Sequence, residues 1–146
     1  MESVMSVTLN GQLLGRTHYA TRAVLERELT ALGLTFAQSL LLTAVAAAHG
    51  PIPGDQAVRR LVDGLKVDLA TARGVLAELV DAALVSADAD HVTITERGRS
   101  VQSRAAAAGA AIGARLWTDL SVDDVAATAR VLETVRQRAE AALAAH

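Results

Sequence analysis

Alanine is the residue that most limits what this chain can fold into. It fills 31 of the 146 positions, whereas aromatic side chains are only 2% of the sequence and consist of Tyr19, Phe36 and Trp117. Alanine is the strongest helix former and adds little volume to a core. A β-sandwich or barrel would need more threonine and more aromatic residues. The composition therefore predicts a single, mainly α-helical domain over residues 1–146, packed closely through small side chains.

The composition also excludes several classes of protein. The chain has no cysteine, so it has no disulfide, no thiolate zinc site and no cysteine nucleophile, which fits a reducing cytoplasm. The first 16 residues lack the basic start and long apolar run of a signal peptide. The most apolar run, residues 105–114, is ten residues long. A membrane span needs about twenty. We therefore expect a cytoplasmic protein with no membrane partner.

Apolar spacing and capping residues predict two helices at the start of the chain. The first covers about residues 9–32, and Gly33 is positioned to end it. The second covers about residues 36–48, with Thr35 as its N-cap. Because this second segment is apolar nearly all round, we expect it to be the buried central helix of the fold.

The middle of the chain shows the pattern of a helix-turn-helix. Residues 55–65 place apolar side chains on one face, and residues 68–83 repeat them at helical spacing. The turn between them is only Lys66-Val67, and Asp68 is a natural N-cap for the second helix. Two short helices joined by so tight a turn form a helix-turn-helix.

Strand material occurs only after these helices. Residues 84–85 and 92–95 flank an acidic six-residue turn at 86–91, which predicts a small β-hairpin. The chain is expected to be helical again over about 96–117, and Ser121 is positioned to cap a last helix. The predicted order is therefore α-α-α-α-β-β-α-α.

Three segments together resemble the MarR family of transcriptional regulators. Residues 65–85 (LKVDLATARGVLAELVDAALV) resemble the family's recognition-helix stretch, in which a Leu-Gly-Ile-Asp turn leads to a helix ending in Gly-Leu-Val. Residues 92–99 (VTITERGR) resemble the wing strand and its Leu-Thr-Glu-Lys-Gly-Arg exit. Residues 33–38 (GLTFAQ) resemble the Gly-Leu-Thr-Pro-x-Gln entry to the second helix. The three segments occur in the family's order and spacing, and the resemblance covers nearly the whole chain.

The resemblance implies a fold and a role. The fold is mainly α, a winged helix-turn-helix with a short two-stranded wing and with N- and C-terminal dimerisation helices. On this basis residues 1–146 form one domain, with dimerisation helices at about 8–33 and 100–146 and a winged-helix lobe at about 36–99. Members of the family act as homodimers, and many are repressors that a small phenolic or carboxylate ligand releases from double-stranded operator DNA.

The recognition helix of this chain departs from the family pattern. Its outward face carries Leu69, Ala70, Thr71, Arg73 and Gly74. Thr71 matches the family's threonine, but Arg73 stands where serine is common and Gly74 where arginine is common. Arg73 either takes over that arginine's contact or is a solvated surface charge. The candidate DNA-binding residues are Thr71, Arg73, Arg59 and Arg60.

The wing and the net charge argue against strong DNA binding. The family's wing usually carries an arginine that enters the minor groove, whereas the tip here is Asp88-Ala89-Asp90-His91. Residues 54–99 hold six basic and eight acidic side chains, a net charge of −2. Each phosphate contact that is lost weakens DNA binding. Two hypotheses follow: a ligand-responsive regulator with a small contact set, which we favour, or a MarR-fold protein that has lost DNA binding and binds or transforms a small molecule.

Helix 1 carries a polar cluster that suggests a ligand site. Arg16 and Tyr19 are three residues apart, and His18 and Arg22 four apart, so each pair shares a helix face. In the family, helix 1 lines the ligand pocket, and an arginine there often meets an anionic ligand. Trp117 and Tyr19 would supply aromatic walls. The predicted ligand-binding residues for a small aromatic or anionic molecule are Arg16, His18, Tyr19, Arg22 and Trp117. The alternative is the rim of a dimer interface, where the same residue types are enriched.

The sequence favours a non-enzymatic role. It lacks the nucleophile elbow, the phosphate-binding loop, the dinucleotide fingerprint and the His-Glu-x-x-His motif. No two histidines have metal-ligand spacing, so we expect no metal and no cofactor. An enzyme that works by positioning a substrate through Arg16, His18, Tyr19 or Trp117 remains an open alternative, and we assign no catalytic residue.

Overall fold

The computed structural model of the chain describes residues 6–145, which divide into two compact units. The first unit ends at Ile112 and the second begins at Gly113, so the boundary falls within helix α5. The elements are α1 (Gly11–Ala31), α2 (Phe36–Ala47), β1 (Ile52–Pro53), α3 (Gly54–Leu65), α4 (Leu69–Asp81), β2 (Val85–Ala87), β3 (His91–Ile94), α5 (Glu96–Leu116) and α6 (Val122–Ala144). Within the described residues this is the predicted order with one strand, β1, added.

The first two helices start at capping residues that satisfy their free backbone amides. The Asn10 Oδ1 atom accepts a hydrogen bond of 2.9 Å from the backbone amide of Leu13. At α2 the Thr35 hydroxyl oxygen accepts from the Gln38 amide at 3.1 Å, and the Gln38 Oε1 atom accepts in return from the Thr35 amide at 3.0 Å. This reciprocal pair is a capping box. The predicted N-cap of the second helix is therefore confirmed.

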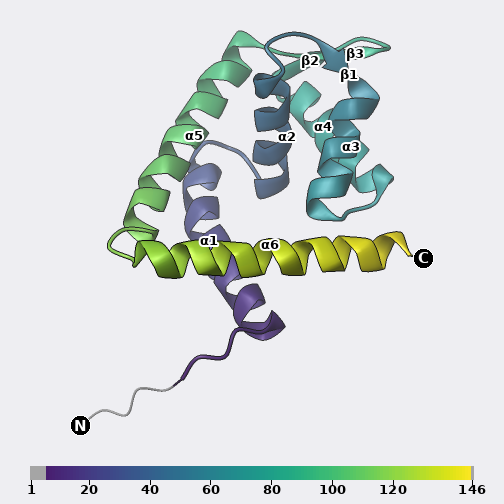
Figure 1. The fold of residues 1–146 in the computed structure, drawn as a ribbon. Coiled ribbons are helices and arrows are strands. Elements are labelled where there is room, and N and C mark those ends of the chain that lie inside the picture. The colour runs from purple at the N-terminus through teal and green to yellow at the C-terminus, as the bar shows by residue number, and fades with distance from the viewer. Residues whose placement is uncertain (1–5, 146) are drawn as a thin grey trace. The chain divides into compact units, whose positions relative to one another are not determined.

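Helix α2 is the buried central helix that its apolar sequence predicts. Leu41, Leu42 and Val45 are at most 1% exposed. Figure 1 shows α2 inside the first unit, where it contacts α1, α3, α4 and β3. Helices α3 and α4 turn their apolar faces toward this core. Their buried residues are Ala57, Val58, Leu61, Ala72, Val75 and Leu79.

The sheet has three antiparallel strands rather than the two that the sequence predicts. Strand β3 lies in the middle, with β2 on one side and β1 on the other. Ile52 pairs with Val92, and both side chains are buried. Pro53 has no backbone N–H, which an edge strand tolerates. The Gly-Pro-Ile-Pro-Gly segment (residues 50–54) has the composition of a turn, so its sequence does not indicate the two-residue strand within it. The hairpin turn is also tighter than predicted and contains only residues 88–90.

Helix α5 begins in close contact with the start of β2. The Thr95 hydroxyl accepts a hydrogen bond from the Gly98 amide at 2.9 Å and donates one to the Ala83 carbonyl oxygen at 2.7 Å. The Thr95 amide donates to the Leu84 carbonyl oxygen at 3.1 Å. A Cβ atom on Gly98 would lie 1.9 Å from that same oxygen, so only glycine fits there. The Thr-Glu-Arg-Gly segment therefore fastens α5 to the end of α4.

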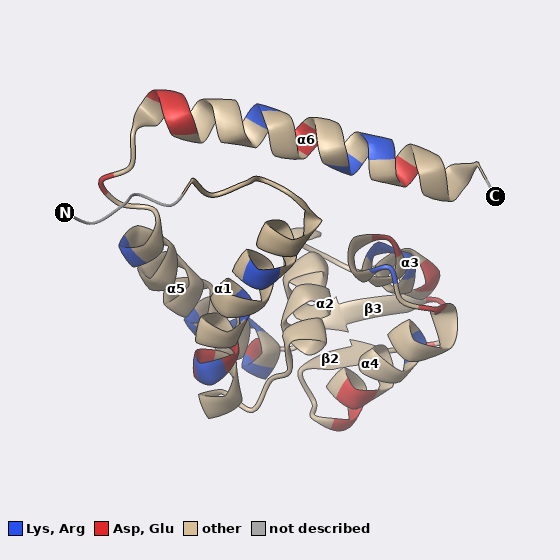
Figure 2. Cartoon of the chain, turned by 90° about the horizontal axis from the view of Figure 1, so that it is seen from below, with Lys and Arg blue, Asp and Glu red and all other residues tan. Residues whose placement is uncertain are grey.

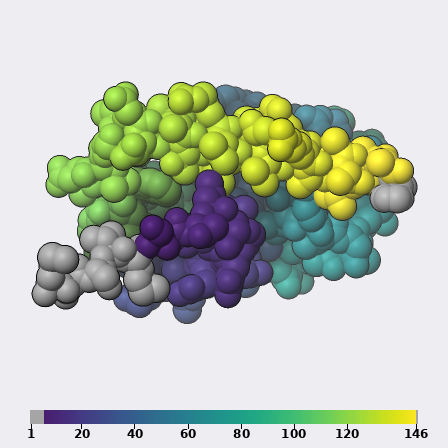
Figure 3. Space-filling view, turned by 60° about the horizontal axis from the view of Figure 1, so that its bottom comes forward, coloured from purple at the N-terminus to yellow at the C-terminus, as the bar shows by residue number. Residues whose placement is uncertain are grey.

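The second unit contains α6, a helix with no buried side chain among its described residues. The hydroxyl oxygen of Ser121 accepts from the Asp124 amide at 3.3 Å, as expected of an N-cap. Arg136 forms ion pairs with Glu133 and, at 2.7 Å, with Glu140. Figure 2 shows acidic and basic segments alternating along α6, and Figure 3 shows its side chains at the surface in yellow. Its exposed large apolar side chains are Val122, Val125, Val131, Val135 and Leu143.

Within residues 6–145, no single helix is long and apolar enough to cross a membrane. Helices α1 and α2 meet the criterion of length and composition only when taken together, and the chain bends by 77° between them.

Helices α1 and α4 end in the same motif. After α1, the Leu34 amide donates to the Leu29 carbonyl oxygen at 2.9 Å. After α4, the Leu84 amide donates to the Leu79 carbonyl oxygen at 3.0 Å. This is the Schellman pattern, which requires a left-handed residue just before the donating leucine. All four leucines are buried, so each helix end is also closed by an apolar contact.

The left-handed residue is Gly33 in one motif, with φ of 76°, and Ala83 in the other, with φ of 59°. A side chain disfavours this conformation, and glycine does not. We therefore expect Ala83→Gly to raise the free energy of unfolding by about 0.5–1 kcal/mol. Urea unfolding followed by circular dichroism measures the change. The matched control is Gly33→Ala, which should lower stability by a similar amount. A loss of stability in Ala83→Gly would contradict this account.

Candidate functional site

The helix-turn-helix is formed by α3, a three-residue connection (66–68) and α4. Lys66 ends α3 in the left-handed conformation, with φ of 57°, and its amide donates to the Val62 carbonyl oxygen at 2.9 Å. The Asp68 carboxylate then accepts from the Thr71 amide at 2.7 Å. The Thr71 backbone amide and, secondarily, its side chain lower the pKa of Asp68. The predicted N-cap is therefore confirmed, and it places a stable negative charge at the start of α4.

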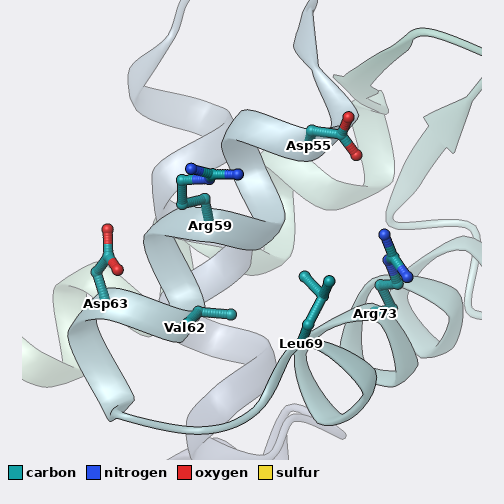
Figure 4. A pocket seen from close by; sticks show the side chains of 6 residues that line it. All are labelled: Asp55, Arg59, Val62, Asp63, Leu69 and Arg73. Carbon is teal, nitrogen blue, oxygen red and sulfur yellow. The ribbon is translucent and has the colours of Figure 1, made fainter. Parts of the chain in front are cut away.

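Two of the four predicted DNA-binding residues lie together. Arg59 on α3 and Arg73 on α4 line one cavity of about 370 Å³ between the two helices (Figure 4). Both side chains are exposed, and neither forms an ion pair or hydrogen bond among the described residues. Val62 and Leu69 supply the apolar part of the lining. The groove thus presents two free guanidinium groups on either side of an apolar centre.

The other two residues lie elsewhere. Arg60 lines a separate, mainly leucine-lined cavity of about 200 Å³ between α2 and α3. Because Arg59 and Arg60 are adjacent on a helix, their side chains leave α3 in different directions. Thr71 is exposed on α4, and its backbone amide donates to the Asp68 carboxylate. The four predicted positions therefore do not form one continuous site within the chain.

Acidic side chains accompany both free arginines. Asp55 and Asp63 line the same cavity as Arg59 and Arg73. Arg73 also borders a second cavity of about 250 Å³, whose lining includes Asp88 and Asp90 of the wing. Figure 2 shows red acidic segments on both α3 and α4. The electrostatic field of this surface is therefore mixed rather than uniformly positive.

The acidic wing tip is a structural element and not only a surface charge. The Asp88 carboxylate accepts hydrogen bonds from the amides of Asp90, at 2.8 Å, and His91, at 2.7 Å. These two backbone donors, in that order, lower the pKa of Asp88. The carboxylate thus holds the tight turn between β2 and β3.

Two of the five predicted ligand-binding residues, His18 and Arg22, contact Phe36, and a third, Tyr19, lies against His18. The Arg22 guanidinium lies 4.2 Å from the centre of the Phe36 ring, and its Nε bonds Glu26 at 2.8 Å. The His18 ring is edge-on to Phe36 at 6.3 Å and tilted against Tyr19 at 5.4 Å. Phe36 and Glu26 were not among the predicted site residues. The four-residue spacing of Arg22 and Glu26 indicates that they share a helix face, so their ion pair was predictable from the sequence. The contact of α1 with Phe36 joins two helices, and no spacing along the chain indicates it.

Arg16 and Trp117 are not part of this cluster. Arg16 is exposed on α1 and has no hydrogen bond or ion pair among the described residues. Trp117 follows α5 in the second unit, where its side chain is 63% exposed. In residues 6–145 no group of three or more histidine or acidic side chains is arranged to hold a metal ion.

Comparison with known proteins identifies the fold. The chain is 27% identical to the Mycobacterium tuberculosis MarR family protein Rv2887, with 86% of this chain and 92% of that chain covered and a TM-score of 0.64. A mutant of E. coli MarR complexed with operator DNA is 23% identical over 86% of this chain and 91% of that chain, with a TM-score of 0.71. CouR from Rhodococcus jostii RHA1, bound to p-coumaroyl-CoA, is 20% identical over 86% and 90%, with a TM-score of 0.72. No protein-family model and no curated protein matches the sequence.

The similarity extends over most of the chain in each comparison and agrees with the helix-turn-helix and wing described above. The chain therefore has the winged helix-turn-helix fold of the MarR-family structures to which it is similar.

Proposed function

We propose that this chain is a small-molecule-responsive, DNA-binding transcriptional regulator of the MarR type that acts as a homodimer. The observation that carries the proposal is the pair of exposed guanidinium groups of Arg59 and Arg73 at the groove of the helix-turn-helix, neither of which has a partner within residues 6–145. Free arginines on such a surface suit phosphate oxygens and base edges. Structures of Rv2887 and of E. coli MarR in complex with DNA support this choice. A cytoplasmic location, where chromosomal DNA is accessible, belongs to the same proposal.

The charge distribution limits how the DNA would be held. Asp55 and Asp63 share the groove with the two arginines, and the wing tip offers Asp88 and Asp90 where a cation would bind phosphate. Affinity that depends on few phosphate contacts has a shallow dependence on salt. We therefore propose a small contact set, centred on Arg59 and Arg73 with Thr71 and Arg60 at its edges.

The alternative function is a MarR-fold protein that has lost DNA binding and uses its small-molecule site alone. The acidic side chains beside each free arginine are the observation that favours it. A catalytic role at that site would have to act by positioning, because the described residues show no nucleophile and base in contact.

The ligand proposal concerns helix α1. Arg16 is exposed and unpaired among the described residues, whereas Arg22 is already held by Glu26 and Phe36. A free guanidinium binds a carboxylate through two parallel hydrogen bonds. We therefore propose that Arg16 meets the anionic group of a small aromatic ligand, with His18, Tyr19 and Arg22 of the same helix as further candidate contacts. Structures of Rv2887 with p-aminosalicylic acid and of CouR with p-coumaroyl-CoA support this class of ligand.

The homodimer proposal rests on α6. A single chain leaves the apolar stripe of this helix exposed, including Val125, Val131 and Val135. Large exposed apolar patches usually mark interaction surfaces. A second copy of the chain, packed in a closed symmetric pair, would cover the stripe.

DNA binding is tested first, by mobility shift against the duplex upstream of the chain's own gene at several salt concentrations. We expect Arg59→Ala and Arg73→Ala each to weaken binding about tenfold, the loss of one charged hydrogen bond. Each should also reduce the slope of log affinity against log salt by about one. Arg104→Ala on α5 is the matched control and should leave both values unchanged. Absence of specific binding by an intact dimer at any salt would favour the alternative function.

Ligand binding is tested by isothermal titration with p-aminosalicylate as the probe. We expect Arg16→Ala to weaken binding at least tenfold, since it removes a charged hydrogen-bond donor, and to leave the melting temperature almost unchanged because Arg16 is exposed. Arg27→Ala, another exposed arginine of α1, is the control and should bind as the wild type does. Unchanged affinity in Arg16→Ala would remove that residue from the site.

Dimerisation is tested by sedimentation velocity at micromolar concentration. We expect Val135→Glu to shift the chain to monomer, because it places a charge within the apolar stripe of α6. Thr134→Glu is the matched control, since it adds the same charge outside the stripe, and Arg138 can pair with a glutamate at either position. The proposal predicts that Thr134→Glu stays dimeric. If both variants remain dimers, the α6 stripe is not the interface.

A further inference from the structure

The first turns of α4 expose an apolar surface. Leu69, the first residue of the helix, is 47% exposed, and Ala70 and Gly74 are exposed beside it. In a helix-turn-helix, the N-terminal residues of the second helix are the ones that reach base edges. The part of this chain best placed to contact bases is therefore mostly methyl groups and backbone.

Few side chains on this segment can form hydrogen bonds with a base. Thr71 and Arg73 carry the only side-chain hydrogen-bonding groups between residues 69 and 74. The Arg73 guanidinium is the one cation among them, it has no partner among the described residues, and guanine is the base that an arginine contacts with two bonds. Apolar contact is therefore left as a main source of discrimination at neighbouring base pairs.

Leu69 lies between the two cations of the groove. Figure 4 shows its side chain pointing from the first turn of α4 toward α3, with Val62 on one side and Arg73 on the other. Arg59 lines the same cavity from α3. An apolar centre with a guanidinium group on each side complements a thymine beside a guanine, because Leu69 can meet the apolar 5-methyl group, Arg73 the guanine edge and Arg59 a phosphate. Thymine is the one standard base with a methyl group in the major groove.

We propose that Leu69 contacts the 5-methyl group of a thymine in the major groove of duplex DNA, next to a guanine bound by Arg73. This inference rests on the proposed DNA-binding function and adds a sequence preference to it. The target of each helix-turn-helix therefore contains one thymine whose methyl group matters, at a fixed position relative to a guanine.

The test starts with duplexes selected by the wild-type protein from a random pool. Each thymine of a selected duplex is then replaced singly by uracil, which removes only the methyl group. We expect one position in each half-site at which affinity falls about fourfold, the equivalent of one buried methyl-sized group. Leu69→Ala should lower the affinity for the thymine duplex by at least that factor and should no longer distinguish thymine from uracil. Alanine is a good first residue for the helix, so the fold is expected to persist, as a melting curve checks.

Leu40→Ala is the matched control, because Leu40 is an exposed leucine of the same lobe, 39% exposed, but lies on α2. It should keep the full sensitivity to uracil. A flat uracil series with normal DNA binding overturns the role of Leu69 and leaves the proposed function intact. A Leu69→Ala variant that still distinguishes uracil also overturns it. If the wild-type protein selects no duplex, the proposed function and this inference fail together.

Discussion

The carbonyl group of Leu84 is the point on which the lobe's geometry depends. It belongs to the residue that closes the Schellman motif of α4, and it accepts a hydrogen bond from the Thr95 amide. It also lies so close to Gly98 that a Cβ atom on that residue would overlap it. Three elements thus meet at the Leu84 peptide group: α4 ends, β2 begins and α5 starts. Because Thr95 bonds the neighbouring Ala83 carbonyl as well, α4 and the wing keep a fixed relation to each other.

On that rigid frame, local electrostatics decide what the surface can bind. The fold presents Arg59 and Arg73 to one groove, yet Asp55 and Asp63 line the same space. The net charge of the lobe disfavours binding to a polyanion. The guanidinium groups of Arg59 and Arg73, which have no partner within residues 6–145, favour a small number of contacts with one. Coulomb interactions at an exposed surface are screened within about 10 Å at ordinary salt. The charges nearest to a bound group therefore contribute more to its interaction energy than the net charge of the lobe does. Apolar contacts made by residues 69–74 then account for a larger share of the binding energy.

Much of the fold is predictable from the sequence because its signals are local. Capping residues such as Thr35 and Asp68, and the apolar spacing of α4, define helices within a few residues. Strand β1 was missed because two residues are too few to show a period, and its pairing with β3 is a long-range contact. The site was less predictable for the same reason. Arg59 on α3 and Arg73 on α4 line the same groove, and His18 and Arg22 on α1 contact Phe36 on α2. No spacing along the chain indicates either of these contacts between helices.

The turn between α3 and α4 has a practical consequence for chemistry on this molecule. Lys66, which closes α3 there in the left-handed conformation, is exposed and is the single lysine of the sequence. Apart from the α-amine of the chain, an amine-directed fluorophore therefore attaches at this one position, and the absence of cysteine leaves thiol chemistry free for a second label placed at will. A fluorophore on Lys66 of the unsubstituted protein thus lies at the edge of the helix-turn-helix, a few residues along the chain from Leu69 and Arg73, where its emission would report binding at the groove.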